Sequence, residues 1–192
     1  MEYAYRYASP LGGITMTSDG KSLTGLSFDG HGSSSPKNEE ILLPVFEDAM
    51  KWLDTYFEGR SPGFTPALRF KSTSFRETVW NKILSIPYGH TVTYGEIAER
   101  IALQYGITRM SAQAVGAAAG CNPILLIVPC HRVVGSGGRL TGYSCGIEIK
   151  KRLLEIERPA PLPYSTEDPP DPREKSSGKL FPASEEILEE KP

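Results

Sequence analysis

The segment TYGEIAERIALQYGITRMSAQAVGAAAG, residues 93–120, decides the fold of the second half of the chain. Thr93 followed three residues later by Glu96 is a capping box, which marks the start of a helix. Apolar residues then recur at helical spacing. After a short turn, residues 111–120 are almost entirely Ala, Gly and Val apart from Gln113. Two short helices joined by a tight turn are typical of a helix-turn-helix.

The sequence on both sides of this motif predicts a helical domain over residues 74–158. A capping box that begins at Ser74 predicts a helix before the motif. After it, Asn122-Pro123 stops the second helix, and the apolar run 124–128 predicts a buried strand. A Gly-rich loop at 135–146 and a last amphipathic helix follow.

The first 70 residues predict a small antiparallel β-meander with one helix. Tyrosines at positions 3, 5 and 7 alternate with other residues, and two further strand patterns with turns between them extend to residue 28. Apolar residues at helical spacing run from Val45 to Tyr56 and stop at Gly59. The Gly and Pro residues in 59–73 suit a linker.

The expected fold class is therefore α/β (α+β) with two domains, residues 1–70 and residues 74–158. The Pro-rich tail at 159–192, which also carries many Ser, Glu and Lys residues, is expected to be mostly disordered.

Composition excludes several classes of protein. Hydrophobic residues make up 39% of the chain and charged residues 23%, which suits a packed globular core. No apolar stretch is long enough for a membrane span, and the N-terminus lacks the pattern of a secretory signal. The 3 cysteines include no C-x-x-C pair, and the 3 histidines are scattered. We therefore expect free thiols in a reducing, cytoplasmic compartment, or a nuclear one in a eukaryote, and no metal.

The net charge of −2 conceals an uneven distribution along the chain. Residues 71–158 carry 11 Lys and Arg against 6 Asp and Glu, whereas both flanking segments are acidic. A basic excess confined to one block is where a nucleic-acid contact is expected, although such an excess is also common on surfaces without that role.

The run Pro129-Cys130-His131-Arg132-Val133 is the sharpest chemical feature. The thiolate is the reactive form of cysteine, and a neighbouring base or positive charge increases its population. Taken alone, the pattern also fits an inert core cysteine beside a surface arginine.

Together with Asn122-Pro123 before it and Gly142-Tyr143-Ser144 after it, this run resembles the active-site signature of the O6-alkylguanine-DNA alkyltransferases. The resemblance covers roughly residues 1–158. It implies a ribonuclease-H-like first domain, and a winged-helix or helix-turn-helix-like second domain that carries the active cysteine. It also implies direct repair of duplex DNA that contains O6-alkylguanine, by irreversible, stoichiometric transfer of the alkyl group to Cys130.

The same resemblance implies roles for four residues of the reaction centre. Cys130 is the alkyl acceptor, and His131 draws the thiol proton through a water molecule. Glu157 orients that histidine, and Asn122 braces the active-site turn. This is a Cys-His-acid arrangement of the kind that activates nucleophiles in other enzymes. No cofactor is implied, because the cysteine itself is the acceptor.

Further residues are implied to contact DNA or the flipped base through the minor groove. Tyr94 helps to rotate the nucleotide, Tyr143 and Ser144 close over the base, and Ala114 lies on the groove-binding helix. Arg132 is also expected among the DNA-binding residues.

The chain departs from the family pattern at Gln113, where an arginine usually fills the space of the flipped nucleotide. Arg109, one turn earlier, is a candidate to substitute for it. Cys145 stands where Gly is common, and Leu125 replaces a commoner Pro.

Two other functions fit parts of the sequence. One is a non-catalytic protein that binds alkylguanine lesions, although relatives of that kind lack the cysteine that this chain keeps. The other is a Cys-His hydrolase, which would leave the helix-turn-helix unexplained. The expected partner is double-stranded DNA rather than a membrane, bound by a monomer.

Overall fold

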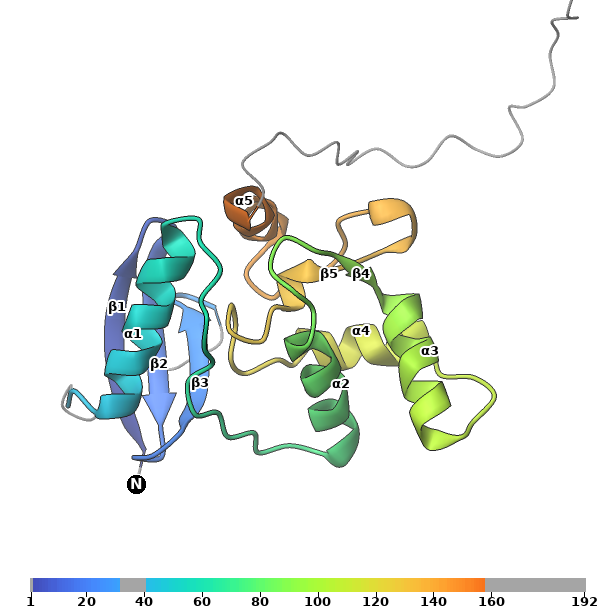
Figure 1. The fold of residues 1–192 in the computed structure, drawn as a ribbon, viewed down its shortest axis with the longest axis horizontal. Helices are drawn as coiled ribbons and strands as arrows, with labels where there is room; N and C mark the ends of the chain where they lie inside the picture. The colour runs from blue at the N-terminus through green and yellow to red at the C-terminus, as the bar shows by residue number, and fades with distance from the viewer. Residues whose placement is uncertain (1, 32–40, 158–192) are drawn as a thin grey trace, which may run out of the picture.

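We describe residues 2–31 and 41–157 of a computed structural model. The predicted tail at 159–192 and most of the predicted loop after residue 28 lie outside these ranges. Figure 1 shows a small sheet with one helix on its face, and a group of short helices on the other side of the third strand.

The N-terminal region is the expected meander. Strands β1 (Tyr3–Ser9), β2 (Gly12–Ser18) and β3 (Leu23–Phe28) form an antiparallel sheet in the order β1-β2-β3. Helix α1 (Pro44–Phe57) packs on this sheet through an apolar face that is almost completely buried. Gly59, two residues beyond the helix, has a φ of 75°, a left-handed conformation that favours glycine.

Among the described residues 74–157, the C-terminal region contains four α-helices, two 3₁₀ helices and a two-stranded sheet. Its α-helices are α2 (Ser74–Leu84), α3 (Tyr94–Tyr105), α4 (Ala112–Gly120) and α5 (Ile147–Glu157). Two short 3₁₀ helices span Cys130–Arg132 and Ser136–Gly138. Strand β4 (Val92–Thr93) pairs in parallel with β5 (Val133–Val134). Helices α3 and α4 form the predicted helix-turn-helix.

Capping explains where two of these helices begin. Thr93 caps α3 through the predicted reciprocal box: its hydroxyl accepts from the Glu96 N–H, and the Glu96 carboxylate accepts from the Thr93 N–H. The box predicted to start at Ser74 is wrong by one residue. Thr73 is the N-cap of α2, and the Glu77 carboxylate accepts instead from the N–H of Ser72.

The buried strand predicted at 124–128 is also wrong. Only Ile124 makes a bridge, to Leu26 of β3, and the chain then turns. The N–H of Val128 donates to the Ile124 carbonyl, and Leu126 has a φ of 67°. The segment is fully buried, as its composition indicates, but its own turn hydrogen bonds replace strand pairing.

The two regions share one core at the edge of β3. The N–H of Leu23 donates to the Ala67 carbonyl at 2.7 Å, and that of Leu26 donates to the Pro123 carbonyl at 2.9 Å. Buried apolar side chains form a continuous cluster from β2 and α1 through α2 to α5. No helix among the described residues is long and apolar enough to cross a membrane.

The α3 capping box yields a stability prediction. We expect Thr93→Ala to lower the free energy of unfolding by about 1 kcal/mol, because the Glu96 N–H loses the hydroxyl that caps it. Chemical denaturation monitored by circular dichroism measures this change.

Thr55→Ala is the matched control. Thr55 lies inside α1 and its hydroxyl only donates to the Lys51 carbonyl one turn back, so alanine there is neutral or slightly stabilising. Equal losses in both variants would contradict a capping role for Thr93.

Candidate active site

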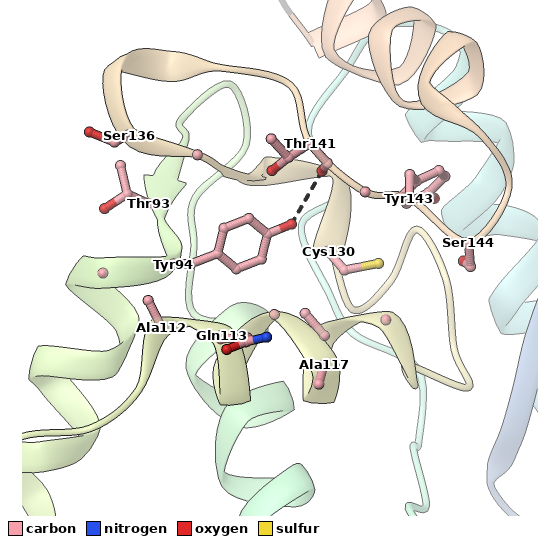
Figure 2. A pocket seen from close by; sticks show the side chains of 16 residues that line it. Thr93, Tyr94, Ala112, Gln113, Ala117, Cys130, Ser136, Thr141, Tyr143 and Ser144 are labelled. Carbon is pink, nitrogen blue, oxygen red and sulfur yellow. Dashed lines mark hydrogen bonds between the residues drawn. The ribbon is translucent and has the colours of Figure 1, made fainter.

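A pocket of about 800 Å³ opens between the helix-turn-helix and the loop that follows β5. Figure 2 shows Cys130 at its inner wall, with α4 on one side and the loop residues on the other. Of the residues expected to contact DNA or base, four line this pocket: Tyr94, Gln113, Tyr143 and Ser144.

Cys130 is buried, with an exposed fraction of 6%. Burial raises the pKa of its thiol to about 11, and a hydrogen bond from Asn122 and the charge of Lys150 offset only part of that effect. The resting side chain is therefore a thiol, and it needs a base before it can act as a nucleophile.

Asn122 holds the turn that carries this cysteine. Its Nδ2 donates to the Val128 carbonyl at 2.8 Å and to the Cys130 Sγ at 3.2 Å, while its Oδ1 accepts from the Ile124 N–H at 3.0 Å. One buried amide thus fixes both ends of the 124–128 turn and contacts the sulfur.

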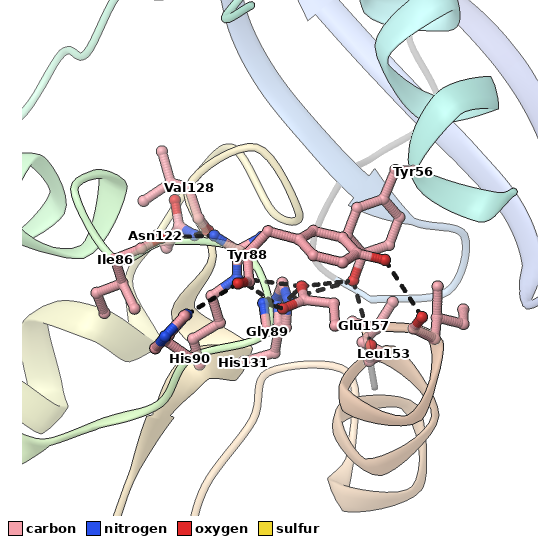
Figure 3. A network of polar contacts seen from close by, with 12 residues as sticks. Tyr56, Ile86, Tyr88, Gly89, His90, Asn122, Val128, His131, Leu153 and Glu157 are labelled. Carbon is pink, nitrogen blue, oxygen red and sulfur yellow. Dashed lines mark hydrogen bonds and ion pairs between the residues drawn. The ribbon is translucent and has the colours of Figure 1, made fainter. Parts of the chain in front are cut away.

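His131, the residue after Cys130, forms a buried pair with Glu157 (Figure 3). The His131 Nε2 lies 2.7 Å from the Glu157 Oε1. Burial lowers the pKa of His131, so the imidazole is neutral at pH 7, and Nε2 carries its hydrogen because it faces a carboxylate. Nδ1 is then the acceptor, and it is buried without a partner among the described residues.

Arg132 and a backbone N–H complete the surroundings of the carboxylate. The Arg132 Nε lies 2.9 Å from the Glu157 Oε2, and Gly89 donates its N–H to the same oxygen at 2.9 Å. Burial alone would raise the pKa of Glu157, but hydrogen bonds from His131 and Arg132 and the charge of Arg132 outweigh it and hold that pKa well below its usual value.

Two family models match consecutive parts of the chain. Residues 2–70 match the family description "6-O-methylguanine DNA methyltransferase, ribonuclease-like domain", and residues 74–159 match the DNA binding domain of the same family. The chain belongs to the 6-O-methylguanine DNA methyltransferase family.

Relatives of the chain include methyltransferases from bacteria and from archaea. The chain is 41% identical over 151 residues to a methylated-DNA–protein-cysteine methyltransferase of Mycobacterium tuberculosis, covering 78% of this chain and 88% of that protein. It is 40% identical over 163 residues to one from Methanosarcina acetivorans, covering 82% and 98%.

Solved structures of the methyltransferase family have the same fold. The crystal structure of the M. tuberculosis O6-methylguanine methyltransferase has a TM-score of 0.71 at 40% identity, over 84% of this chain and 96% of that one. A structure of the M. tuberculosis protein in complex with DNA has a TM-score of 0.70 at 40% identity, covering 82% and 93%.

Several residues that the sequence analysis singled out do not line the pocket in the structure. Arg132 is buried and its Nη1 donates to the Ile86 carbonyl at 2.6 Å, so it is neither a surface charge nor part of the pocket. Ala114 and Leu125 do not line the pocket either. Arg109 lines a neighbouring hollow along the α3–α4 connection, together with Gln113.

Cys145 is buried beside Ser144, with 3.9 Å between the sulfur and the hydroxyl oxygen. It is not among the residues that line the pocket.

Sequence reasoning missed Lys150. Its Nζ donates to the Val133 carbonyl at 2.6 Å and to the Thr141 carbonyl at 2.9 Å, which ties β5 to the loop, and it lies 6.0 Å from the centre of the Tyr94 ring. Burial lowers its pKa to about 8. Its position in the helix could have indicated that Lys150 is buried, because it lies seven residues before Glu157 and therefore on the same face of α5.

The Glu157 carboxylate yields a pH-dependent stability prediction. Its folded pKa lies below the usual value for glutamate, so its contribution to stability is present above about pH 5 and is lost as the pH falls toward 2. We expect Glu157→Gln to lower the free energy of unfolding by about 3 kcal/mol at pH 7, because Arg132 loses its buried counter-charge.

Denaturation at pH 7 and at pH 3 measures this difference, and Glu155→Gln on the exposed side of α5 is the matched control. We expect the gap between wild type and Glu157→Gln to narrow at pH 3. A gap of unchanged size would show that the Glu157 charge does not stabilise the fold.

Proposed function

We propose that the protein repairs duplex DNA by moving an alkyl group from O6 of guanine to Cys130 in one irreversible, stoichiometric step. The observation that carries this proposal is the position of Cys130: it lines a pocket beside a helix-turn-helix, and the next residue pairs with a buried carboxylate. Family membership and the named activity of the relatives support the same reaction.

The raised pKa of the Cys130 thiol means that the reaction needs a base to remove the thiol proton. Because burial raises the pKa of the Cys130 thiol to about 11, its side chain is almost entirely protonated at pH 7. The neutral His131, with Nδ1 as its acceptor, serves as the base through a bridging water molecule, and Glu157 stabilises the imidazolium that results. The sulfur–carbon bond forms as the O6–carbon bond breaks and its electron pair stays with guanine. The imidazolium gives up the former thiol proton to solvent, and the released guanine takes up one proton from solvent, so that overall the thiol proton replaces the alkyl group.

The remaining site residues fit the handling of DNA. The small side chains of α4, Ala114 among them, allow close approach to the minor groove, and Gln113 lies at the pocket beside the duplex. Tyr94 and the Tyr143–Ser144 segment enclose the flipped base. We assign Arg132 to holding Glu157 rather than to contacting DNA.

The proposal extends to organisation and location. Residues 1–70 act as a supporting domain and residues 74–158 as the DNA-binding and acceptor domain of a monomer. The protein works inside the cell, where its DNA substrate lies, in the cytoplasm of a prokaryote or the nucleus of a eukaryote.

Cys130→Ser tests the acceptor. We expect this variant to bind a methylated duplex but to show no methyl transfer, because a hydroxyl ionises far less readily than a thiol. Intact-mass spectrometry after incubation with an O6-methylguanine duplex measures the gain of one CH₂ unit on the protein.

Cys121→Ser, which changes an exposed thiol, and Cys145→Ser should still gain that mass. Methyl transfer by Cys130→Ser would reject Cys130 as the acceptor. Binding by wild type with no mass change at all would instead indicate a non-catalytic lesion-binding protein.

Gln113→Arg tests base flipping. Extruding a nucleotide costs a few kcal/mol of stacking and pairing, and an inserted arginine offsets more of that cost than a shorter, neutral glutamine. We therefore expect Gln113→Arg to speed single-turnover repair of a duplex and to leave the reaction with free O6-alkylguanine base unchanged.

Gln104→Arg is the control, because it adds the same charge to an exposed position of α3 outside both hollows of this region. Faster reaction of Gln113→Arg with the free base would place position 113 in the chemical step and contradict a role in flipping.

A further inference from the structure

Tyr56 brings a hydroxyl group from the N-terminal region into the His131–Glu157 pair. The tyrosine lies near the end of α1 and is fully buried. Its hydroxyl donates to the Glu157 Oε1 at 3.0 Å and lies 3.3 Å from the His131 Nε2. Figure 3 shows the phenol reaching this pair from α1.

Packing fixes the position of the Tyr56 ring. Trp52 stacks on it with ring centres 5.2 Å apart, and its edge-on contacts include Tyr88 at 6.0 Å and His131 at 6.2 Å. The backbone carbonyl of Leu153 lies 3.4 Å from the hydroxyl oxygen as a second acceptor. These contacts therefore hold the Tyr56 hydroxyl in a fixed position next to His131 and Glu157.

The hydroxyl acts on one oxygen of the carboxylate. The Glu157 Oε1 accepts from the His131 Nε2–H and from the Tyr56 O–H. While the Tyr56 hydrogen points at the carboxylate, the lone pairs of its oxygen remain available toward Nε2–H. Both neighbours of Nε2 are then acceptors, which favours hydrogen on Nε2 and leaves Nδ1 able to accept a proton.

We propose that Tyr56 is a positioning residue for alkyl transfer, which fixes the tautomer and orientation of His131 and moderates the charge that Glu157 presents to it. This inference rests on the function proposed above. It makes the N-terminal region a contributor to the reaction centre.

The direction of the effect follows from the hydrogen bond. A donor to a carboxylate stabilises its charged form and makes it less basic. When that donor is removed, Glu157 stabilises the imidazolium more strongly. This effect outweighs the loss of the Tyr56 oxygen as an acceptor, because that oxygen is neutral and lies 3.3 Å from Nε2, whereas the charged Glu157 oxygen lies at 2.7 Å, so the pKa of His131 rises. The substitution does not change the other ionisable groups that act on His131 or on Glu157, which are Lys150 on α5, Arg132 on the 3₁₀ helix of His131, and Tyr88 after α2.

Tyr56→Phe tests the proposal with free O6-alkylguanine base as substrate, so that DNA binding does not enter the measurement. The readout is the single-turnover rate as a function of pH, whose acid limb reports the pKa of the essential base. We expect the limb to move to higher pH, and the rate above it to fall about tenfold because the imidazole is less well oriented.

Tyr7→Phe is the matched control. The Tyr7 hydroxyl donates to the Asp54 Oδ1 at 2.7 Å, so this variant removes another tyrosine–carboxylate bond of α1, on the outer surface. We expect its pH profile to match that of wild type. An acid limb for Tyr56→Phe at the wild-type pH, whatever its rate or stability, would overturn the proposal.

A second variant keeps the test decisive if Tyr56→Phe does not fold. Incorporation of 3-fluorotyrosine at position 56 keeps the hydroxyl and makes it a stronger donor, so the acid limb should move to lower pH. An unmoved limb, or one moved to higher pH, would overturn the proposal.

The two proposals fail in different ways. Failure of the proposed function would appear in wild type, as the absence of an alkyl adduct on Cys130. Failure of the Tyr56 proposal would leave that adduct intact and the pH profile of Tyr56→Phe unchanged.

Discussion

The buried carboxylate of Glu157 is the interaction on which the arrangement of the site depends. An isolated charge in the core would be very costly, and this one is kept ionised by four donors from three parts of the chain: Tyr56, Gly89, His131 and Arg132. These donors belong to α1, the turn after α2, and the 3₁₀ helix that carries the cysteine. One carboxylate in α5 thus connects α1, the turn after α2 and the 3₁₀ helix, and it holds them in fixed positions relative to one another.

The hydrogen bonds to Glu157 also explain why a carboxylate is tolerated near the C-terminal end of α5. The last residue of a helix faces the negative end of its dipole, which disfavours a carboxylate. At Glu157 the hydrogen bonds from a guanidinium, an imidazole, a phenol and a backbone N–H outweigh that effect. The turn that carries Asn122 and Cys130 is held in the same way, by a buried polar side chain with several partners.

Local patterns predicted most elements of the fold, because hydrophobic period and capping chemistry act within one segment. The meander, α1, the helix-turn-helix and α5 follow from them. Residues 124–128 were mispredicted because an apolar run fixes burial but not backbone conformation, which Asn122 determines here. Tyr56 and Lys150 could not be assigned from local patterns: a tyrosine or lysine on an apolar face shows burial, whereas its partners lie on segments distant in sequence.

The short β4–β5 ladder has a consequence for the energetics of the encounter with DNA. Thr93 is at once the N-cap of α3 and the ladder partner of Val134, which lies four residues after Cys130. The ladder therefore fixes the position of the helix-turn-helix relative to the Cys130 sulfur before DNA binds. Under the function proposed above, an extruded nucleotide meets an acceptor that this ladder already holds in place, so less conformational entropy of the protein is lost on reaching the reactive geometry.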